Sequence, residues 1–216
     1  SHLDALSAMD GMLMDLDFTG KLDLIAVTGN TNDVRVYHQF GPLLFTTITR
    51  ASGIPASLHN AQSVMMEDWN RDGNMDVIVS RKEGPPLLLE KQRGGRLVPR
   101  EPTHWVAGAV VCTGDFDNDL RPDLAVVSDG KISICFNGGE RKEIAFPGSA
   151  GVRQIVAVDY DNDGWLDLWA VGEKIQVWRN LGLSGFQEQT AQLGLDRFDG
   201  GAVAEIHFAD FDLDCD

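Results

Sequence analysis

Apolar and polar positions along the chain follow a pattern that is typical of short β-strands. Apolar runs of about four to seven residues, rich in β-branched side chains, recur along most of the sequence. Some follow short acidic segments, at 24–27, 77–79, 124–127 and 168–171. Others precede such segments, at 109–113, 154–158 and 202–208. Helical periodicity is missing except for a single turn expected within 191–195. The pattern therefore predicts an all-β protein.

The same order of elements returns in each part of the chain. After the second run comes a strand of alternating character, as at 131–136 and 174–178, then a turn rich in Gly and Asn, and then a more polar strand such as 186–190. Four short strands in a period of about 40 to 50 residues indicate one blade of a β-propeller. We therefore expect residues 1–216 to form a single propeller domain, or part of one, with about four four-stranded blades.

Acidic segments of nine residues mark the period, at intervals of about 50 residues. Four copies are complete, at 15–23, 68–76, 115–123 and 159–167, and an incomplete fifth copy occupies 210–216. Because the last copy stops within its own loop, we expect the chain to be a fragment of a longer propeller or to lack its end. An open fragment exposes strand edges, which would favour a homodimer.

Each acidic segment carries oxygen donors at alternate positions, which converge when the chain turns tightly. In the fourth copy, Asp159, Asp161 and Asp163 stand at positions 1, 3 and 5, Gly164 at position 6 permits a positive φ, and Asp167 stands at position 9. Position 7 would supply a backbone carbonyl. The predicted metal-binding set is Asp15, Asp17, Thr19, Lys21 and Asp23; Asp68, Asn70, Asp72, Asn74 and Asp76; Asp115, Asp117, Asp119, Arg121 and Asp123; Asp159, Asp161, Asp163, Trp165 and Asp167; and Asp210, Asp212 and Asp214.

Hard oxygen donors favour Ca²⁺, with Mg²⁺ as second choice because it demands a tighter octahedron. An EF-hand is excluded, because it needs a Glu at position 12 and flanking helices. That position holds Ala26, Val79, Val126 and Ala170, each within a strand-like run. Polar turns without metal are the alternative reading, because Asp, Asn and Gly are common turn residues. Repetition favours the metal, since clustered carboxylates repel one another without a cation.

The copies are not equivalent. Thr19 at position 5 and Asn70 at position 3 each remove one carboxylate from the first and second loops. Leu120 stands where glycine is expected in the third loop, so that loop is predicted to be strained or vacant.

The net charge, the cysteines and the histidines limit which partners and sites are expected. A formal net charge of −15 argues against nucleic acid and against anionic lipid as partners. No apolar stretch is long enough for membrane insertion, and the first residues contain no signal peptide. A disulfide between Cys112 and Cys135 stays open at this point, and Cys215 has no assigned partner. The histidines lie in unrelated contexts and predict no zinc site; they are His2, His38, His59, His104 and His207.

The acidic loops and their flanking strands resemble the FG-GAP/VCBS repeats of integrin α-like propellers. Within that group, 177–182 followed by 186–190 and 194–195 is similar to the variant of bacterial secreted relatives of cartilage acidic protein, and 37–54 echoes it. The resemblance covers the chain from about Asp10 onward. It implies a propeller with Ca²⁺ in the loops between the first two strands of successive blades, an extracellular or cell-envelope location, and a role in adhesion or ligand binding.

Two classes of function follow from these observations. The first is a non-enzymatic scaffold in which Ca²⁺ rigidifies each blade and a protein or carbohydrate ligand binds elsewhere; the recurrence of the carboxylates favours it, because a catalytic site is usually unique. The second is a Ca²⁺-assisted polysaccharide lyase or hydrolase, which would need a base that breaks the repeat. His207, just before the fifth loop, is the candidate for that base.

Overall fold

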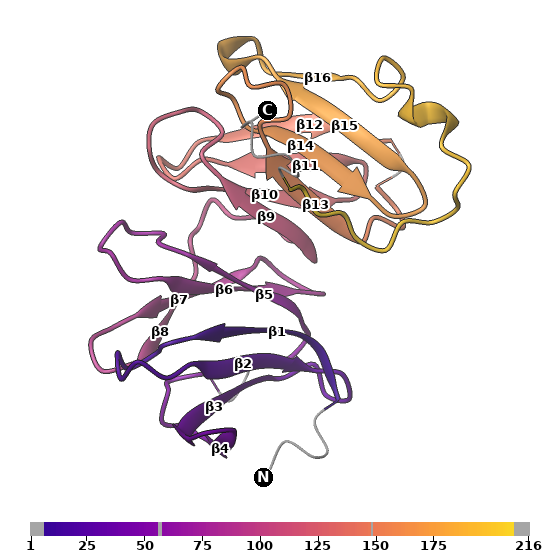
Figure 1. The fold of residues 1–216 in the computed structure, drawn as a ribbon. Coiled ribbons are helices and arrows are strands. Elements are labelled where there is room, and N and C mark those ends of the chain that lie inside the picture. The colour runs from indigo at the N-terminus through magenta and orange to yellow at the C-terminus, as the bar shows by residue number, and fades with distance from the viewer. Residues whose placement is uncertain (1–6, 56–57, 148, 210–216) are drawn as a thin grey trace. The chain divides into compact units, whose positions relative to one another are not determined.

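The structure is a computed structural model that describes residues 7–55, 58–147 and 149–209 (Figure 1). Its strands form four antiparallel sheets of four strands each, and every sheet follows chain order. The first two sheets contain β1 (Ala8–Met14), β2 (Asp23–Thr28), β3 (Val34–Gly41) and β4 (Leu44–Thr47), and β5 (Ala61–Glu67), β6 (Asp76–Arg81), β7 (Leu87–Lys91) and β8 (Leu97–Arg100). The other two contain β9 (Val110–Gly114), β10 (Asp123–Ser128), β11 (Lys131–Cys135) and β12 (Arg141–Ala145), and β13 (Gln154–Val158), β14 (Asp167–Val171), β15 (Ile175–Asn180) and β16 (Phe186–Glu188). Two short 3₁₀ helices, η1 (Gly182–Ser184) and η2 (Leu195–Arg197), complete the described elements.

The sheets fall into two compact units, residues 1–109 and 110–216, with two sheets in each. In the first unit β1 lies against β5, and in the second β9 lies against β13, so the first strands of neighbouring sheets face each other. Four-stranded antiparallel meanders packed face to face are the blades of propeller-type proteins. The predictions of an all-β fold and of four-stranded blades are therefore confirmed.

The second strand of each blade is buried along nearly its whole length. β6 and β10 each have five consecutive buried residues, whereas the outer strands β4 and β12 are mostly exposed. A strand covered on both faces reads as a continuous apolar run rather than as an alternating one. This explains why the runs after each acidic segment are uniformly apolar, as in Val77-Ile-Val79.

Each unit has its own hydrophobic core between its two sheets. In the first unit Ile25, Val36 and Leu89 are fully buried in one cluster. In the second, Phe146 and Trp178 form an edge-to-face pair with ring centroids 4.6 Å apart. Because both sheets of a unit contribute to one core, the acidic loops at the strand ends rest on a rigid support.

Of two expectations for the last described segment, one differs from the structure and the other is confirmed. Residues 202–208 were predicted to form a strand, but they have no regular secondary structure. Two hydrogen bonds among the described residues join their backbone to the neighbouring blade, from Val203 N to Gly172 O at 2.7 Å and from Ile206 N to Gln154 Oε1 at 2.7 Å. The residues after 209 lie outside the described part of the chain. The turn expected at 191–195 is confirmed, because Gly194 N donates to Ala191 O and Leu195 N to Thr190 O, each at 3.0 Å, and η2 follows directly.

The strand order excludes a disulfide between Cys112 and Cys135. Cys112 lies on β9 opposite Ala125, and Cys135 lies on β11 opposite Leu124, so β10 separates them. Two strand spacings place their backbones about 9 to 10 Å apart, beyond the reach of a disulfide. Burial raises the pKa of the Cys112 thiol to about 12, which keeps it protonated and unreactive.

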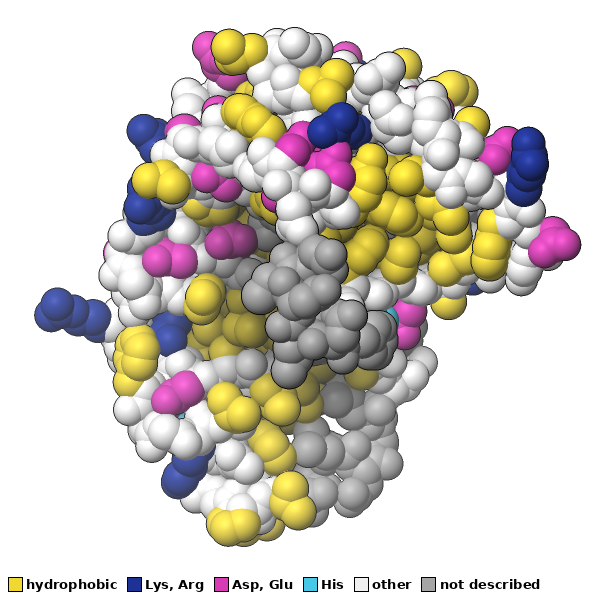
Figure 2. All heavy atoms as spheres, turned by 45° about the horizontal axis from the view of Figure 1, so that its top comes forward, with side chains coloured by type: hydrophobic (Ala, Val, Ile, Leu, Met, Phe, Trp, Pro, Cys, Tyr) yellow, Lys and Arg dark blue, Asp and Glu magenta, His cyan; other side chains and the backbone are white. Residues whose placement is uncertain are grey.

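The surface combines charged and apolar side chains. Hydrophobic side chains gather in one area in the upper half of the face drawn in Figure 2, with acidic and basic groups around it. Apolar side chains that are at least half exposed include Leu120, Leu183 and Phe198. Among the described residues, no helix is long and apolar enough to cross a bilayer.

Candidate metal centres

The first aspartate of each complete acidic loop holds the loop backbone in a tight turn. In all four loops its two carboxylate oxygens accept the N–H groups of positions 5 and 6, at distances between 2.8 and 3.1 Å. These residues are Asp15, Asp68, Asp115 and Asp159. The shared hydrogen bonds make the four loops copies of one conformation.

That conformation needs two residues with positive φ in each loop. Position 4 has φ between 57° and 59° in all four copies, at Phe18, Arg71, Asn118 and Asn162. Position 6 has φ of 78°, 84° and 86° at Gly20, Gly73 and Gly164, and of 68° at Leu120. The third loop is therefore strained as predicted, because a leucine adopts the left-handed conformation that the other copies give to glycine.

The ninth-position aspartate clamps the loop to its own blade. Asp23, Asp76, Asp123 and Asp167 are at most 1% exposed. One oxygen of each accepts an N–H at the end of the third strand or just after it, at 2.7 to 2.9 Å. In the first, third and fourth loops the other oxygen accepts the N–H of position 2, at 3.0 to 3.3 Å. In the second loop Asp76 Oδ2 is buried and has no hydrogen-bond partner within the described part of the chain.

Burial of these clamps is electrostatically costly. Desolvation raises the pKa of Asp76, Asp123 and Asp167 to about 6, although backbone N–H groups oppose the shift. Neighbouring loop carboxylates push in the same direction as burial. A cation in the loop would relieve this cost, because an opposite charge favours the ionised form.

The third and fourth loops bring three carboxylates together. Asp115, Asp117 and Asp123 each offer an oxygen within 4.8 Å of the others, and Asp159, Asp161 and Asp167 do the same. These are positions 1, 3 and 9. Position 5, predicted as a further ligand, is outside both groups. Its Oδ1 instead accepts the N–H of position 7, at 2.8 Å in the third loop and 3.0 Å in the fourth.

The fourth loop already contains a cationic side chain. Arg179, on β15, forms an ion pair with Asp161 at 2.6 Å and donates a hydrogen bond to Asp163 at 2.8 Å. Its guanidinium thus lies beside position 3, one of the three gathered carboxylates. Any metal ion in this loop has to compete with it.

The second loop gathers no such group among the described residues. Asn70 replaces the carboxylate at position 3, and its side chain donates to Asp72 at 3.3 Å. Asn74 donates both its backbone and side-chain N–H to Asp72, at 2.8 Å each, which lowers the pKa of that carboxyl. This loop is closed by its own hydrogen bonds.

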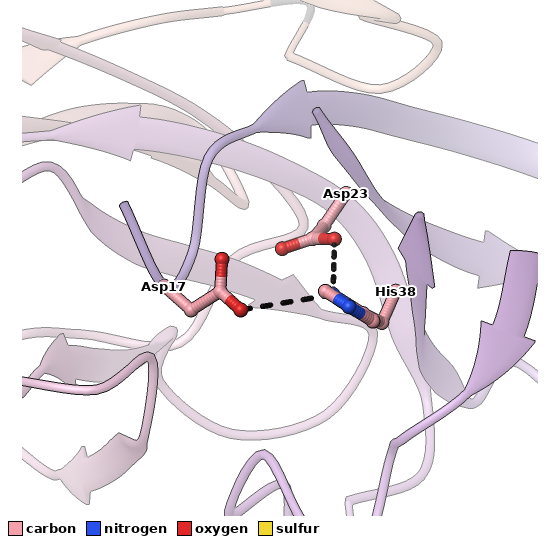
Figure 3. A group of neighbouring side chains, drawn as sticks. All are labelled: Asp17, Asp23 and His38. Carbon is pink, nitrogen blue, oxygen red and sulfur yellow. Dashed lines mark hydrogen bonds and ion pairs between the residues drawn. The ribbon is translucent and has the colours of Figure 1, made fainter. Parts of the chain in front are cut away.

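The first loop combines two carboxylates with an imidazole. Figure 3 shows Asp17, Asp23 and His38 pointing toward one another, and each offers a ligand atom within 4.8 Å of the others. Thr19 donates its backbone N–H to Asp15, and the Lys21 ammonium donates to Phe40 O at 3.2 Å. A Thr19 ligand and the backbone carbonyl of Lys21 stay predictions. The fifth loop, with Asp210, Asp212 and Asp214, lies outside the described residues.

His38 was missed by sequence reasoning, which found no metal context for any histidine. A signal was available in the repeat. The residue after His38 is Gln39, whose N–H binds the ninth-position clamp, and aligning the blades on that residue places Glu90, Phe136 and Arg179 at the position of His38. The side chain at this position contacts the acidic loop in the first blade, through His38, and in the fourth, through Arg179. The residue type at this position differs in all four blades.

In each unit, one side chain from the second blade donates a hydrogen bond to the acidic loop of the first blade. This side chain belongs to the residue directly after the position that corresponds to His38. Lys91 is 4% exposed and donates its ammonium to Asp15 O at 2.8 Å, and its Nζ lies 3.9 Å from the centre of the Phe18 ring. Burial lowers its pKa, while nearby aspartates oppose that shift. In the second unit Asn180 takes this place and donates to Phe116 O at 2.9 Å. The loops of each pair are thus held at a fixed spacing.

Four-stranded blades with a repeated acidic loop before each second strand define a propeller-type repeat protein. The sequence profile of the FG-GAP-like repeat matches residues 15–79 and 115–170, and the chain belongs to this family. Among curated proteins, human cartilage acidic protein 1 is 27% identical over 155 aligned residues, which cover 62% of this chain and 23% of that protein.

A solved lectin structure shows a similar fold. A lectin from Agrocybe aegerita, described as recognising non-reducing terminal N-acetylglucosamine, superposes with a TM-score of 0.52 and 15% identity over 82% of this chain and 50% of the lectin. A chain of the Photorhabdus luminescens Tc holotoxin pore matches with a TM-score of 0.42 and 19% identity over 85% of this chain and 9% of its own length. The chain thus spans at most half of the length of each of these proteins.

Proposed function

We propose that this protein is a non-enzymatic binding scaffold whose blades are stabilised by Ca²⁺ in the acidic loops. One observation carries the proposal: the third and fourth loops place carboxylates from positions 1, 3 and 9 within 4.8 Å of one another on one shared backbone frame. An all-oxygen donor set of this kind suits a hard cation, and Ca²⁺ tolerates the irregular geometry of a loop better than Mg²⁺ does. Extracellular calcium-binding modules work at submillimolar to millimolar Ca²⁺, so we place the protein outside the cytoplasm.

Repetition supports a structural rather than a catalytic role for the carboxylates. The same aspartates that would bind the ion also accept the hydrogen bonds that hold the loop and clamp it to the third strand. His207, the candidate base of the alternative lyase or hydrolase, is 77% exposed and lies 3.6 Å from Glu205. Both residues are outside regular secondary structure. No observation favours this enzyme over the scaffold.

The ligand of the scaffold is proposed to be a glycan, and a cavity in the second unit offers a place for it. The cavity has a volume of about 320 Å³ and is lined by Phe136, Trp165 and Phe186 together with Arg141 and Lys142. Aromatic faces stack on sugar rings, and charged side chains bind sugar hydroxyl and carboxylate groups. The lectin neighbour supports a glycan by analogy of fold alone.

The calcium proposal is tested by thermal unfolding and calorimetry of chelator-treated protein with added Ca²⁺ or Mg²⁺. A site at a free Ca²⁺ concentration one hundred times its Kd adds about 2.7 kcal/mol to stability, which corresponds to a Tm rise of about 5 to 10 °C. Asp161→Asn should remove the contribution of the fourth loop. Asp196→Asn, which makes the same charge change on the surface, should not. Absence of bound Ca²⁺ would refute the proposal.

Glycan binding needs a separate measurement. Titration with N-acetylglucosamine-terminated oligosaccharides should show binding that Trp165→Ala weakens at least tenfold, whereas Leu193→Ala, at an exposed apolar residue outside the cavity lining, should leave it unchanged. Hydrolysis or elimination of a polysaccharide that is lost in His207→Ala would instead establish the enzyme.

A further inference from the structure

The donor set of the first loop differs in kind from that of the third and fourth loops. His38 Nδ1 lies 2.9 Å from Asp23 Oδ1 and 3.9 Å from Asp17 Oδ2. The two aspartates come from the loop and from the start of β2, and the histidine comes from β3 (Figure 3). The side chains of His38 and Asp17 are 26% and 32% exposed, and that of Asp23 is 1% exposed. The group is therefore partly sheltered and reachable from solvent.

The first loop has also lost hard negative charge. Thr19 replaces the aspartate that the other complete copies carry at position 5. The buried ammonium of Lys91 lies close enough to Asp15, Asp17 and Asp23 to interact with each of them electrostatically. Both features weaken a site that depends on charge alone. An imidazole nitrogen, by contrast, forms a more covalent bond, which suits the later first-row transition metals.

A cavity adjoins the three side chains and leaves room for a further ligand. It has a volume of about 260 Å³, and its lining includes Asp17, Asp23 and His38 together with Ser52 and Gly95. Asp17 Oδ1 is buried and has no hydrogen-bond partner among the described residues. A buried carboxylate oxygen without a partner is costly, and a metal ion would satisfy it.

We propose that the first loop binds a first-row transition-metal dication, represented by Zn²⁺ or Co²⁺, through His38 Nδ1, Asp17 and Asp23. Tetrahedral Zn²⁺ bonds of about 2.0 to 2.2 Å place ligand atoms about 3.4 Å apart, between the two distances from His38 Nδ1 to the carboxylates. The fourth position faces the cavity and takes water or a small ligand.

Hydrogen bonds outside the group already orient its most buried ligand. Asp23 accepts the N–H of Gln39 at 2.9 Å and that of Leu16 at 3.2 Å, so its carboxylate cannot rotate freely. Outer contacts of this kind fix ligand orientation in metal sites. The inference goes beyond the calcium proposal, because it concerns another ion, another donor set and another loop.

The experiment is a Co²⁺ titration of the chelator-treated full chain, followed by visible absorption, with Zn²⁺ content measured in parallel. We expect one equivalent of Co²⁺ to give the strong d–d bands of a low-coordinate site, and Zn²⁺ to abolish them. His38→Gln and Asp17→Asn should each weaken Co²⁺ binding at least tenfold. His59→Gln is the matched control, because His59 also pairs with an aspartate, Asp33, at 2.9 Å but outside the loop.

Several outcomes would overturn the inference. They are the absence of low-coordinate Co²⁺ bands in the unmodified chain, bands that survive both His38→Gln and Asp17→Asn, and bands that His59→Gln removes equally. Co²⁺ that Asp161→Asn releases and His38→Gln retains would also overturn it, since that ion would lie in the fourth loop. Because Asp17 accepts no backbone hydrogen bond among the described residues and is partly exposed, Asp17→Asn decides the matter if His38→Gln does not fold. The calcium equivalents of each variant are counted separately, so failure of either proposal leaves the other intact.

Discussion

Leu120 gives the sharpest test of the loop geometry, because it is the non-glycine residue at position 6. Its φ is 68°, and its N–H is held by Asp115 Oδ2 at 2.8 Å, so the loop cannot relax without losing that bond. The left-handed conformation costs a leucine about 1 to 2 kcal/mol. The side chain is 71% exposed and buries little apolar area in return.

Leu120→Gly should therefore stabilise the protein. Relief of the strain is offset by the greater flexibility of glycine in the unfolded chain, about 0.5 to 1 kcal/mol. The net gain is about 0.5 to 1 kcal/mol, or a Tm increase of about 1 to 4 °C for a chain of this size. Differential scanning calorimetry in chelator measures it without contribution from bound metal.

Two further variants test whether the effect of Leu120→Gly comes from backbone strain. Gly164→Leu makes the reverse change in the fourth loop, where φ is 86° and a Cβ would have no heavy atom within 4 Å, so it should destabilise by a similar amount through strain alone. Leu183→Gly removes a fully exposed leucine that does not have a positive φ, and should be slightly destabilising. If Leu120→Gly lowered the Tm as Leu183→Gly does, the strain argument would be wrong.

Three further predictions concern the second unit. Arg179→Gln removes the competing guanidinium and should tighten Ca²⁺ binding in the fourth loop about three- to tenfold by calorimetry; unchanged or weaker binding would contradict the competition. In chelator, the stability of the unmodified chain relative to Asp123→Asn should rise as pH falls from about 7 to about 4, because the folded-state pKa of Asp123 is raised to about 6, which makes the native state bind the proton more tightly than the unfolded state does. Denaturant titrations at several pH values measure this difference, and a fall would refute it. Asn180→Ala leaves Phe116 O without its partner and should cost about 2 kcal/mol, whereas exposed Gln187→Ala should cost less than about 0.5 kcal/mol.

Much of the fold could be predicted from the pattern along the chain. The apolar runs after each acidic loop are the buried second strands, and the alternating segment at 174–178 belongs to β15. These elements depend on local periodicity and on partners within the same blade, both of which lie within one repeat. The strand predicted at 202–208 did not form, which shows that a local apolar pattern does not by itself supply a pairing partner.

The candidate sites could be predicted only in part. Asp115, Asp117 and Asp123 stand close together because their spacing in one turn brings them there, so sequence spacing alone was a sufficient guide. Position 5 was placed in the same group, yet in the fourth loop Asp163 bonds to the N–H of Trp165 and to Arg179 instead. Spacing does not reveal which backbone N–H groups compete for a carboxylate.

The sequence by itself determined the repeat, the all-β class, the position of each loop and the strain at Leu120, because all of these follow from residue types at fixed local spacing. Only the tertiary structure decided what lies over each loop. His38, Lys91 and Arg179 reach the acidic residues across strand pairs and between blades, and their separations along the chain carry no distance information. Antiparallel pairing converts those separations into contacts, and the side chain found there sets the charge and donor type of each loop.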